Sequence, residues 1–193
     1  MRELAKLLKS RLIVAVGDIT AFSGDAIVNA ANSSLLGGGG VDGAIHRAGG
    51  PQVLAECKRL RESSLPEGLR PGEAVMTTAG RLSVRAVIHT VGPVWSGGGR
   101  GEAGTLASCY RRSLELAEAA RFETLAFPAI STGVYGYPRA AAALVAHRAV
   151  EAFLADHEKP RSVYLVFYSE GDAVAFLEAI RADRAKESPG RTP

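Results

Sequence analysis

The sequence predicts a three-layer α/β domain, in which helices cover both faces of a mixed sheet of about six strands. Short apolar runs rich in β-branched residues alternate along the chain with longer segments of helical periodicity. Two glycine-bearing loops each follow an expected strand and precede an expected helix. In open α/β sheets such loops gather at the carboxyl edge, where ligands bind. The length of 193 residues, 47% of them apolar, suits one globular domain with or without tails.

Six segments have the length and composition of buried strands. The first is a β-branched run that begins after Arg11 and ends at Gly17. The second is apolar on successive residues rather than on alternate ones, as expected for a strand covered on both faces. The expected strands are 12–16, 25–29, 73–78, 86–91, 124–129 and 162–168.

Helical patterns lie between these strands and after the last of them. In the segment 102–121 the apolar residues recur at the spacing of one helix face. Pro51 and Pro138 stand where a helix begins, a position that suits proline. The expected helices are 43–48, 51–61, 102–121, 139–156 and 172–185.

The chain is expected to consist of an N-terminal extension (1–11), one domain (12–183) and a flexible C-terminal tail (184–193). The polar segment 95–104 is rich in glycine and predicts a flexible surface loop.

Charge and cysteine content argue against several classes of protein. The formal net charge is +3 without a block of like charges, so a nucleic-acid partner is not indicated and a small polyanion fits as well. Cys57 and Cys109 form no CxxC pair and favour a reducing compartment. No apolar run approaches the ~18–20 residues of a membrane span, so we expect a cytoplasmic protein with no membrane partner.

The strongest ligand pattern lies in residues 29–46. Four consecutive glycines at 37–40 lose much conformational entropy on folding, so a folded domain seldom contains them without a function. The function we infer is to bring the backbone close to a ligand. A second loop, 131–137, carries Gly133 and Gly136. Backbone N–H groups and the helix dipole favour an anion at a helix N-terminus. Two such loops predict a site for two phosphates, that is, for a diphosphate.

Three other interpretations of these loops are weaker. A Walker A loop needs Gly-Lys-Ser or Gly-Lys-Thr, whereas Val41 follows the last of the four glycines. The glycines formally fit G-x-G-x-x-G, but Glu62, the acid at the expected distance, ends a basic helical run rather than a strand. The residues around Ser131 do not form the G-x-S-x-G elbow of serine hydrolases.

Asn32 and Asp42 flank the glycines and are the candidates for chemistry. Asp42 could orient a ligand hydroxyl, activate water or merely cap the helix, and Asn32 could donate and accept hydrogen bonds. His46 either shapes this loop or packs, while His89 is expected to be a satisfied core residue within a strand. On its local sequence, Asp18 is predicted to be a turn or cap residue. The histidines are far apart, and neither H-E-x-x-H nor a cysteine cluster occurs, so we expect no metal site.

Several ordered motifs together resemble the macrodomain family. They are Gly-Asp-Ile-Thr at 17–20, Asn-Ala-Ala-Asn at 29–32, the glycine run with Val-Asp-Gly-Ala-Ile-His at 37–46, His-Thr-Val-Gly-Pro at 89–93 and Ile-Ser-Thr-Gly-Val-Tyr-Gly at 130–136. The resemblance spans about 12–180 and is strongest to the branch that contains bacterial O-acetyl-ADP-ribose deacetylases and MacroD-type ADP-ribosyl hydrolases. It implies the three-layer macrodomain fold.

The resemblance also implies a role for each motif. Asp18 would bind the adenine amino group, with Ile19 beside the ring and Tyr168 stacked on it. The backbone of the two glycine loops would hold the diphosphate through Gly39, Gly40, Val41, Ser131, Thr132, Gly133, Val134 and Tyr135. Asn32 and Asp42 would be the catalytic pair at the distal ribose, which Tyr135 would cover.

The implied reaction is hydrolysis of an ester on the distal ribose of ADP-ribose. The substrates would be O-acetyl-ADP-ribose or proteins mono-ADP-ribosylated on Asp or Glu, with no metal or cofactor and with the chain acting as a monomer. Asp42 would be either a general base or a group that positions water and ribose. Two alternatives stay open: a module that binds ADP-ribose without turnover, and a regulator of ribonuclease III. The presence of Asp42 favours the enzyme, because many pure binders of this fold lack an Asp there.

Overall fold

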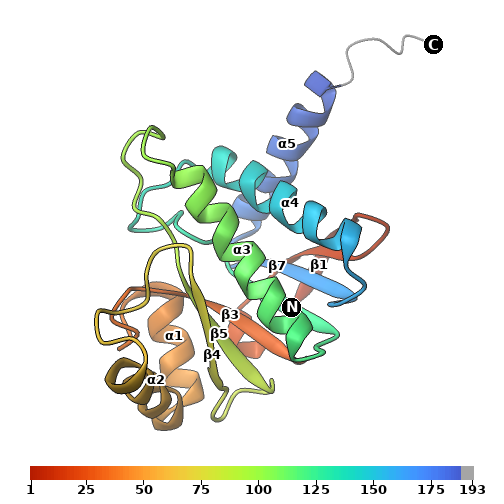
Figure 1. Cartoon of the computed structure of the whole chain (residues 1–193). Helices are drawn as coiled ribbons and strands as arrows, with labels where there is room; N and C mark the ends of the chain where they lie inside the picture. The colour runs from red at the N-terminus through yellow and green to blue at the C-terminus, as the bar shows by residue number, and fades with distance from the viewer. Residues whose placement is uncertain (188–193) are drawn as a thin grey trace, which may run out of the picture.

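The protein, described over residues 1–187 by a computed structural model, is built on one seven-stranded sheet (Figure 1). Its strands are β1 (Arg2–Leu7), β2 (Leu12–Val16), β3 (Ala26–Ala31), β4 (Ala74–Thr78), β5 (Ala86–Val91), β6 (Thr124–Phe127) and β7 (Ser162–Phe167). The order is β1-β2-β7-β6-β3-β5-β4, with five parallel central strands and an antiparallel strand at each edge. All six expected strands form, with ends shifted by at most two residues.

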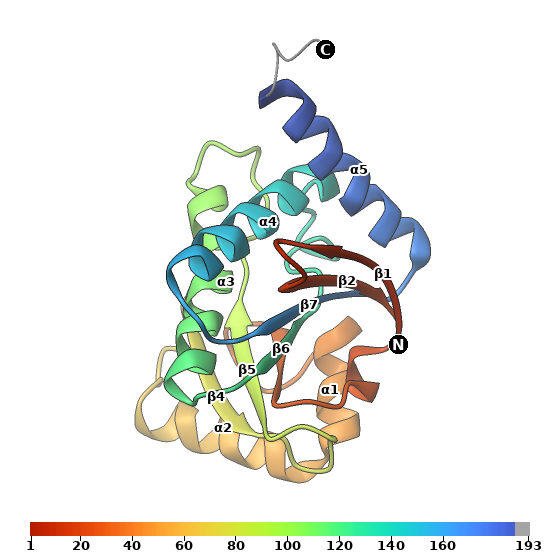
Figure 2. The same cartoon turned by 90° about the vertical axis from the view of Figure 1, so that its right-hand side faces the viewer.

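Helices cover both faces of the sheet and confirm the predicted three layers (Figure 2). One face carries α1 (Gly40–Gly49), α2 (Pro51–Ser63) and the short 3-10 helix η1 (Ile19–Ala21). The other carries α3 (Glu102–Ala119), α4 (Arg139–Asp156) and α5 (Glu170–Glu187). Alternate residues of each central strand enter the two cores: Val28 packs on the α3–α5 side and Ile27 on the α1 side. The strands are therefore apolar on successive residues, because neither face is open to water.

The seventh strand, β1, comes from the segment that was expected to precede the domain. Residues 2–7 pair antiparallel with β2, from Arg2 opposite Val16 to Leu7 opposite Leu12. This strand has charged residues and no fully buried side chain, which is typical of a protected sheet edge. Its composition lacks the apolar pattern by which the buried strands were recognised, so the expectation of about six strands was one short. At the other end, residues 184–187 continue α5, and the remainder of the expected tail, 188–193, lies outside the described residues.

Asp25 aligns the two strands that precede the glycine loops. Its Oδ2 accepts hydrogen bonds from the backbone N–H groups of Glu123 (2.8 Å) and Thr124 (3.1 Å) at the start of β6. Burial alone would raise the pKa of Asp25, but these bonds and those from Arg85 and the Thr124 hydroxyl hold that pKa below its usual value. Because β3 and β6 run parallel from this anchor, the loops that follow them emerge side by side.

None of the helices within residues 1–187 is long and apolar enough to cross a lipid bilayer.

Candidate functional site

A cavity of about 620 Å³ opens at the carboxyl ends of the parallel strands. It lies where the segments after β2, β6 and β7 face the N-terminus of α1, the edge at which ligands bind in open α/β sheets. Its lining includes Asp18, Ile19, Gly40, Val41, Thr132, Gly133 and Tyr168 from the sequence-predicted site.

The first glycine loop presents bare backbone to this cavity. Gly40, the first residue of α1, has φ +57°, and a Cβ there would have no protein atom within 4 Å. No described side chain caps α1 at its N-cap residue Gly39, so the free N–H groups of its first turn are available to an anion. Gly38 lies differently: a Cβ there would be 3.0 Å from Asp42 Oδ2 and 3.1 Å from Asn32 Nδ2. Within the run of glycines, Gly38 therefore allows close packing against Asp42 and Asn32, whereas Gly40 leaves the backbone open to the cavity.

The second loop follows β6 and is folded on itself. Tyr137 N–H donates to Ser131 O (3.0 Å), and Gly136 N–H donates to Gly133 O (2.9 Å). Ser131 has φ +64°, a left-handed conformation that turns the chain out of the strand. Val134, at the tip, is fully exposed, and Tyr135 is half-buried. The loop thus projects its backbone opposite the N-terminus of α1.

The loop after β5 supports the second glycine loop. Trp95 N–H donates to Tyr135 O (2.8 Å), and the Trp95 ring packs on Tyr137 with centroids 4.6 Å apart. The glycine-rich turn that follows is organised by buried Glu102, which accepts backbone hydrogen bonds from Ser96 (3.0 Å), Gly98 (3.1 Å) and Arg100 (2.7 Å). The segment expected to be a flexible surface loop is thus tied to the start of α3.

Asp18, Ile19 and Tyr168 line the cavity where β2 and β7 end, and Gly17 N–H donates to Phe167 O (2.9 Å) beside them. Asp18 caps η1, as its local sequence predicted: its Oδ1 accepts from Thr20 N (2.9 Å) and Thr20 Oγ1 (2.7 Å). Ile19 is buried, whereas Tyr168 is 86% exposed at the end of β7. An exposed ring at a cavity mouth, beside a carboxylate, suits a flat heterocycle that stacks and donates hydrogen bonds.

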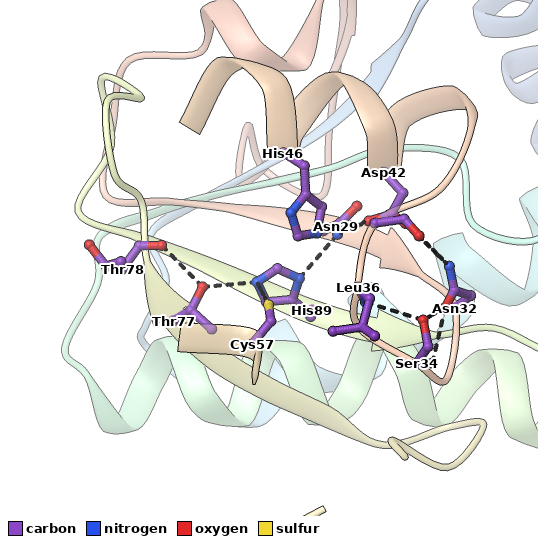
Figure 3. A network of polar contacts seen from close by, with 11 residues as sticks. Asn29, Asn32, Ser34, Leu36, Asp42, His46, Cys57, Thr77, Thr78 and His89 are labelled. Carbon is purple, nitrogen blue, oxygen red and sulfur yellow. Dashed lines mark hydrogen bonds and ion pairs between the residues drawn. The ribbon is translucent and has the colours of Figure 1, made fainter. Parts of the chain in front are cut away.

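Asn32 and Asp42 meet beside the first glycine loop (Figure 3). Asp42 stands in the first turn of α1, and its side chain is 5% exposed. Its Oδ2 accepts from Asn32 Nδ2 at 3.4 Å, while Asn32 Oδ1 accepts from the backbone and hydroxyl of Ser34 (3.0 and 2.5 Å). His46, one turn along α1, places Nε2 3.4 Å from Asp42 Oδ1. Since a carboxylate offers about four lone-pair positions, the contacts with Asn32 and His46 leave it further capacity to accept hydrogen bonds.

A second layer of polar side chains lies behind Asp42. Asn29 Nδ2 donates to Asp42 Oδ1 (2.7 Å) and faces His89 Nδ1 at 3.0 Å, and His89 Nε2 lies 2.9 Å from Thr77 Oγ1. The structure confirms His89 as a core residue, since it is 0% exposed with both ring nitrogens in hydrogen bonds. Asn29 and Thr77 were given no role of their own from the sequence, because only the pairing of β3, β5 and β4 brings them to His89.

His46, Cys57 and His89 form the one group of potential metal ligands found within residues 1–187, with their ligand atoms within 4.8 Å of one another. Both nitrogens of His89 already take part in hydrogen bonds. Burial, assisted by the charges of Asp42 and Glu56, raises the pKa of Cys57 to about 11, so the sulfur stays a thiol. As arranged, the group is a packed polar cluster rather than a set of free ligands.

The predicted binding residues come together around one cavity, and the predicted catalytic pair lies behind one of its walls. Gly39, Ser131, Val134 and Tyr135 lie in the same two loops without lining the cavity. The lining also holds charged side chains that the sequence did not single out: Arg47 on α1, and Arg139 and Asp172, which form an ion pair. No local pattern marks these three, because each lies on an ordinary helix.

Comparisons with known proteins agree on one family. The Macro domain model matches residues 28–146. An O-acetyl-ADP-ribose deacetylase of Salmonella typhimurium is 58% identical over 166 residues, which cover 86% of this chain and 92% of that protein. The Oceanobacillus iheyensis macrodomain with ADP has a TM-score of 0.84 at 42% identity, with 91% and 92% of the two chains covered. The Trypanosoma brucei macrodomain in complex with ADP-ribose has a TM-score of 0.79 at 36% identity, covering 89% of this chain and 69% of that one.

Proposed function

This chain belongs to the Macro domain family, and we propose that it is an O-acetyl-ADP-ribose deacetylase, a hydrolase that frees acetate from the distal ribose of its substrate. One observation carries the proposal: a single cavity joins a stacking ring and a carboxylate to two phosphate-type loops, and Asp42 lies two residues after the last of the four glycines of one loop. That arrangement matches adenine, diphosphate and distal ribose along ADP-ribose. The naming of the Salmonella relative supports the same substrate.

Binding is assigned to the backbone more than to side chains. Gly39, Gly40 and Val41 offer the amides at the start of α1, and the loop from Ser131 to Tyr135 faces them. The positive end of the α1 dipole favours the diphosphate there. Asp18 accepts from the adenine amino group, Ile19 lies against the ring, and Tyr168 stacks on it. Thr132, Gly133 and Val134 complete the second phosphate loop, and Tyr135 covers the distal ribose.

The chemistry is assigned to Asp42 and Asn32. Water attacks the acetyl carbonyl carbon, the bond from that carbon to the ribose oxygen breaks, and the products are acetate and ADP-ribose. Asn32, whose amide is oriented by Ser34 and Gly37, positions the ribose hydroxyls. Asp42 accepts a proton from water or aligns that water, helped by the substrate phosphate. Its anchored carboxylate is compatible with both roles.

The same ester chemistry extends to proteins mono-ADP-ribosylated on Asp or Glu, in which the leaving acid is a side chain. All the residues assigned to the site come from one chain, and the proposed enzyme acts as a monomer. Cys57 and Cys109 are free and buried, in keeping with a cytoplasmic location. A module that binds ADP-ribose without turnover would release no acetate or side-chain acid from these substrates, and neither would a regulator of ribonuclease III.

The deciding experiment incubates the full chain with O-acetyl-ADP-ribose and, separately, with an Asp/Glu-modified protein, and follows released ADP-ribose by chromatography. We expect turnover of the acetylated nucleotide, and a mock purification from cells without the gene serves as the control for contaminating esterases. Tight binding of ADP-ribose with no turnover of either substrate would exclude the enzyme and favour the module that binds ADP-ribose without turnover.

A further inference from the structure

A chain of hydrogen bonds runs away from Asp42 through three neighbouring strands (Figure 3). Asn29 on β3 and His89 on β5 are register partners, so their side chains stand on the same face of the sheet, under α1. The contacts are Asn29 Nδ2 to Asp42 Oδ1 (2.7 Å), Asn29 Nδ2 to His89 Nδ1 (3.0 Å), His89 Nε2 to Thr77 Oγ1 (2.9 Å) and Thr77 Oγ1 to Thr78 O (3.0 Å).

One arrangement of hydrogens satisfies every link of this chain. An ionised carboxylate only accepts, so the atom that faces Asp42 Oδ1 is the nitrogen of Asn29. The second hydrogen of that nitrogen points to His89 Nδ1, which is therefore unprotonated, and the ring hydrogen lies on Nε2. Nε2 donates to Thr77 Oγ1, whose own hydrogen goes to the carbonyl of Thr78. Thr77 Oγ1 thus accepts from the protonated Nε2 of His89, beside Cys57 Sγ at 3.8 Å, and the bare Nδ1 of His89 accepts from the Asn29 amide.

The members of this chain are buried too deeply to touch a ligand. His89 and Asn29 are 0% exposed, and Thr77 is 5% exposed. Burial, followed by the neighbouring His46, lowers the pKa of His89 to about 3, so its ring is neutral in ordinary buffers. Asn29 Oδ1 has no hydrogen-bond partner among residues 1–187. Turning the amide over would place this oxygen against two acceptors, Asp42 Oδ1 and His89 Nδ1, so the nitrogen contacts alone hold it.

We propose that His89 is a positioning residue for the deacetylation: acting through Asn29, it aims the carboxylate of Asp42 at the distal ribose. The inference rests on the proposed function. Asp42 follows glycines at 37–40, which have no side chains to hold the first turn of α1. The carboxylate is held by Asn29 and Asn32, with His46 Nε2 3.4 Å from Oδ1, and of these three side chains Asn29 is the one that hydrogen-bonds to His89.

Substitutions at His89 distinguish the contribution of Nδ1 to kcat from that of Nε2. His89→Phe keeps a ring of similar size, and we expect kcat to fall about tenfold or more while KM changes less than about twofold. His89→Asn places an oxygen near the Nδ1 position and should restore much of the lost kcat. His89→Gln reaches the Nε2 position instead and should not. Equal kcat values for the wild type and His89→Phe would overturn the proposal.

A milder pair of variants guards against misfolding. Thr77→Val removes the hydroxyl that accepts from His89 Nε2 at 2.9 Å and should lower kcat severalfold. Thr90→Val is the matched control, because Thr90 is also a buried strand threonine that donates to a backbone carbonyl, Glu73 O at 2.8 Å, yet it has no link to Asp42. We expect this control to keep the wild-type kcat. Equal losses of kcat in Thr77→Val and Thr90→Val would mean that Thr77 has only a structural role, and would contradict the proposed chain of hydrogen bonds.

A double-mutant cycle and a spectrum complete the test. Because His89 acts through Asn29, the Asn29→Ala variant and the Asn29→Ala/His89→Phe double variant should have the same kcat. A double variant whose kcat falls by the product of the two single effects would overturn the mechanism. Long-range ¹H–¹⁵N NMR should show His89 protonated on Nε2 and bare on Nδ1, and the opposite tautomer would disprove the chain without reference to activity. If the wild type releases no acetate, the proposed function fails, and the spectrum still decides the hydrogen-bond chain.

Discussion

Asn29 Nδ2 donates a 2.7 Å hydrogen bond to Asp42 Oδ1 across the glycine loop that separates the two residues in sequence. Asn29 belongs to a central strand and is fully buried, whereas Asp42 stands in the first turn of the helix beyond the loop. The bond lets the loop between them expose its backbone to a ligand without releasing the carboxylate. Rigid support behind an open loop is what a site needs to hold a reacting group in place.

Asp42→Ala should lower kcat for O-acetyl-ADP-ribose by about 10²–10⁴-fold, the range for a lost acid–base group. Binding of ADP-ribose, measured by calorimetry, should persist because the phosphate loops are untouched. The variant leaves one of the two hydrogens of Asn29 Nδ2 without an acceptor, while the other still faces His89 Nδ1, so the free energy of unfolding should drop by about 1–3 kcal/mol. Asp156→Ala, at the exposed end of α4, is the control. Unchanged turnover in Asp42→Ala would remove this residue from the mechanism.

Gly40→Val should weaken ADP-ribose binding by about tenfold or more, because its side chain would enter the cavity where the diphosphate is placed. Gly101→Val is the matched control: Gly101 also has a positive φ (+77°) and an open Cβ direction, but it does not line the cavity. Both variants carry the strain of a β-branched residue in the left-handed region, so only the difference in affinity reports on the site. Equal affinities in calorimetry would contradict the phosphate cradle.

Tyr168→Ala should lower ADP-ribose affinity about 5- to 150-fold, corresponding to the roughly 1–3 kcal/mol of one base–aromatic stack. Because Tyr168 is 86% exposed, the melting temperature should stay near that of the wild type. Ribose 5-phosphate, which lacks adenine, provides the internal control and should bind both proteins alike. A parallel loss for both ligands would place Tyr168 away from the adenine.

Glu102→Gln should destabilise the protein at neutral pH and much less in acid. The backbone N–H of Glu102 itself, and then those of Arg100, Gly98 and Ser96, hold the pKa of this carboxyl below its ordinary value of 4.5. A lowered folded-state pKa contributes stability above pH 4.5, and this contribution is lost as the pH falls through the folded pKa. Urea unfolding of both proteins at several pH values measures the difference.

Glu67→Gln, a change of charge at an exposed position, is the control for that titration. A stability difference between wild type and Glu102→Gln that does not shrink toward acid would mean that Glu102 does not hold the turn as a carboxylate.

Local sequence was sufficient for most elements of the fold. β2, β5 and α4 begin and end at the predicted residues, because β-branched runs and helical periodicity act over neighbouring positions. The glycine loops were recognised for the same reason, since an entropic penalty is visible in composition alone. β1 could not be predicted from local pattern, because a charged edge strand forms only once β2 offers it hydrogen-bond partners.

Tertiary structure decided which of these pieces meet. Strand order places β3 between β6 and β5, which sets the two glycine loops side by side and gives Asn29 its buried neighbour His89. The sequence identified Asp42 as a carboxylate after glycines and His89 as a core residue, two unrelated facts. They are linked through Asn29 only in the folded chain, because hydrogen bonds act over about 3 Å, and the strand register together with the packing of α1 on β3 brings these residues within that distance.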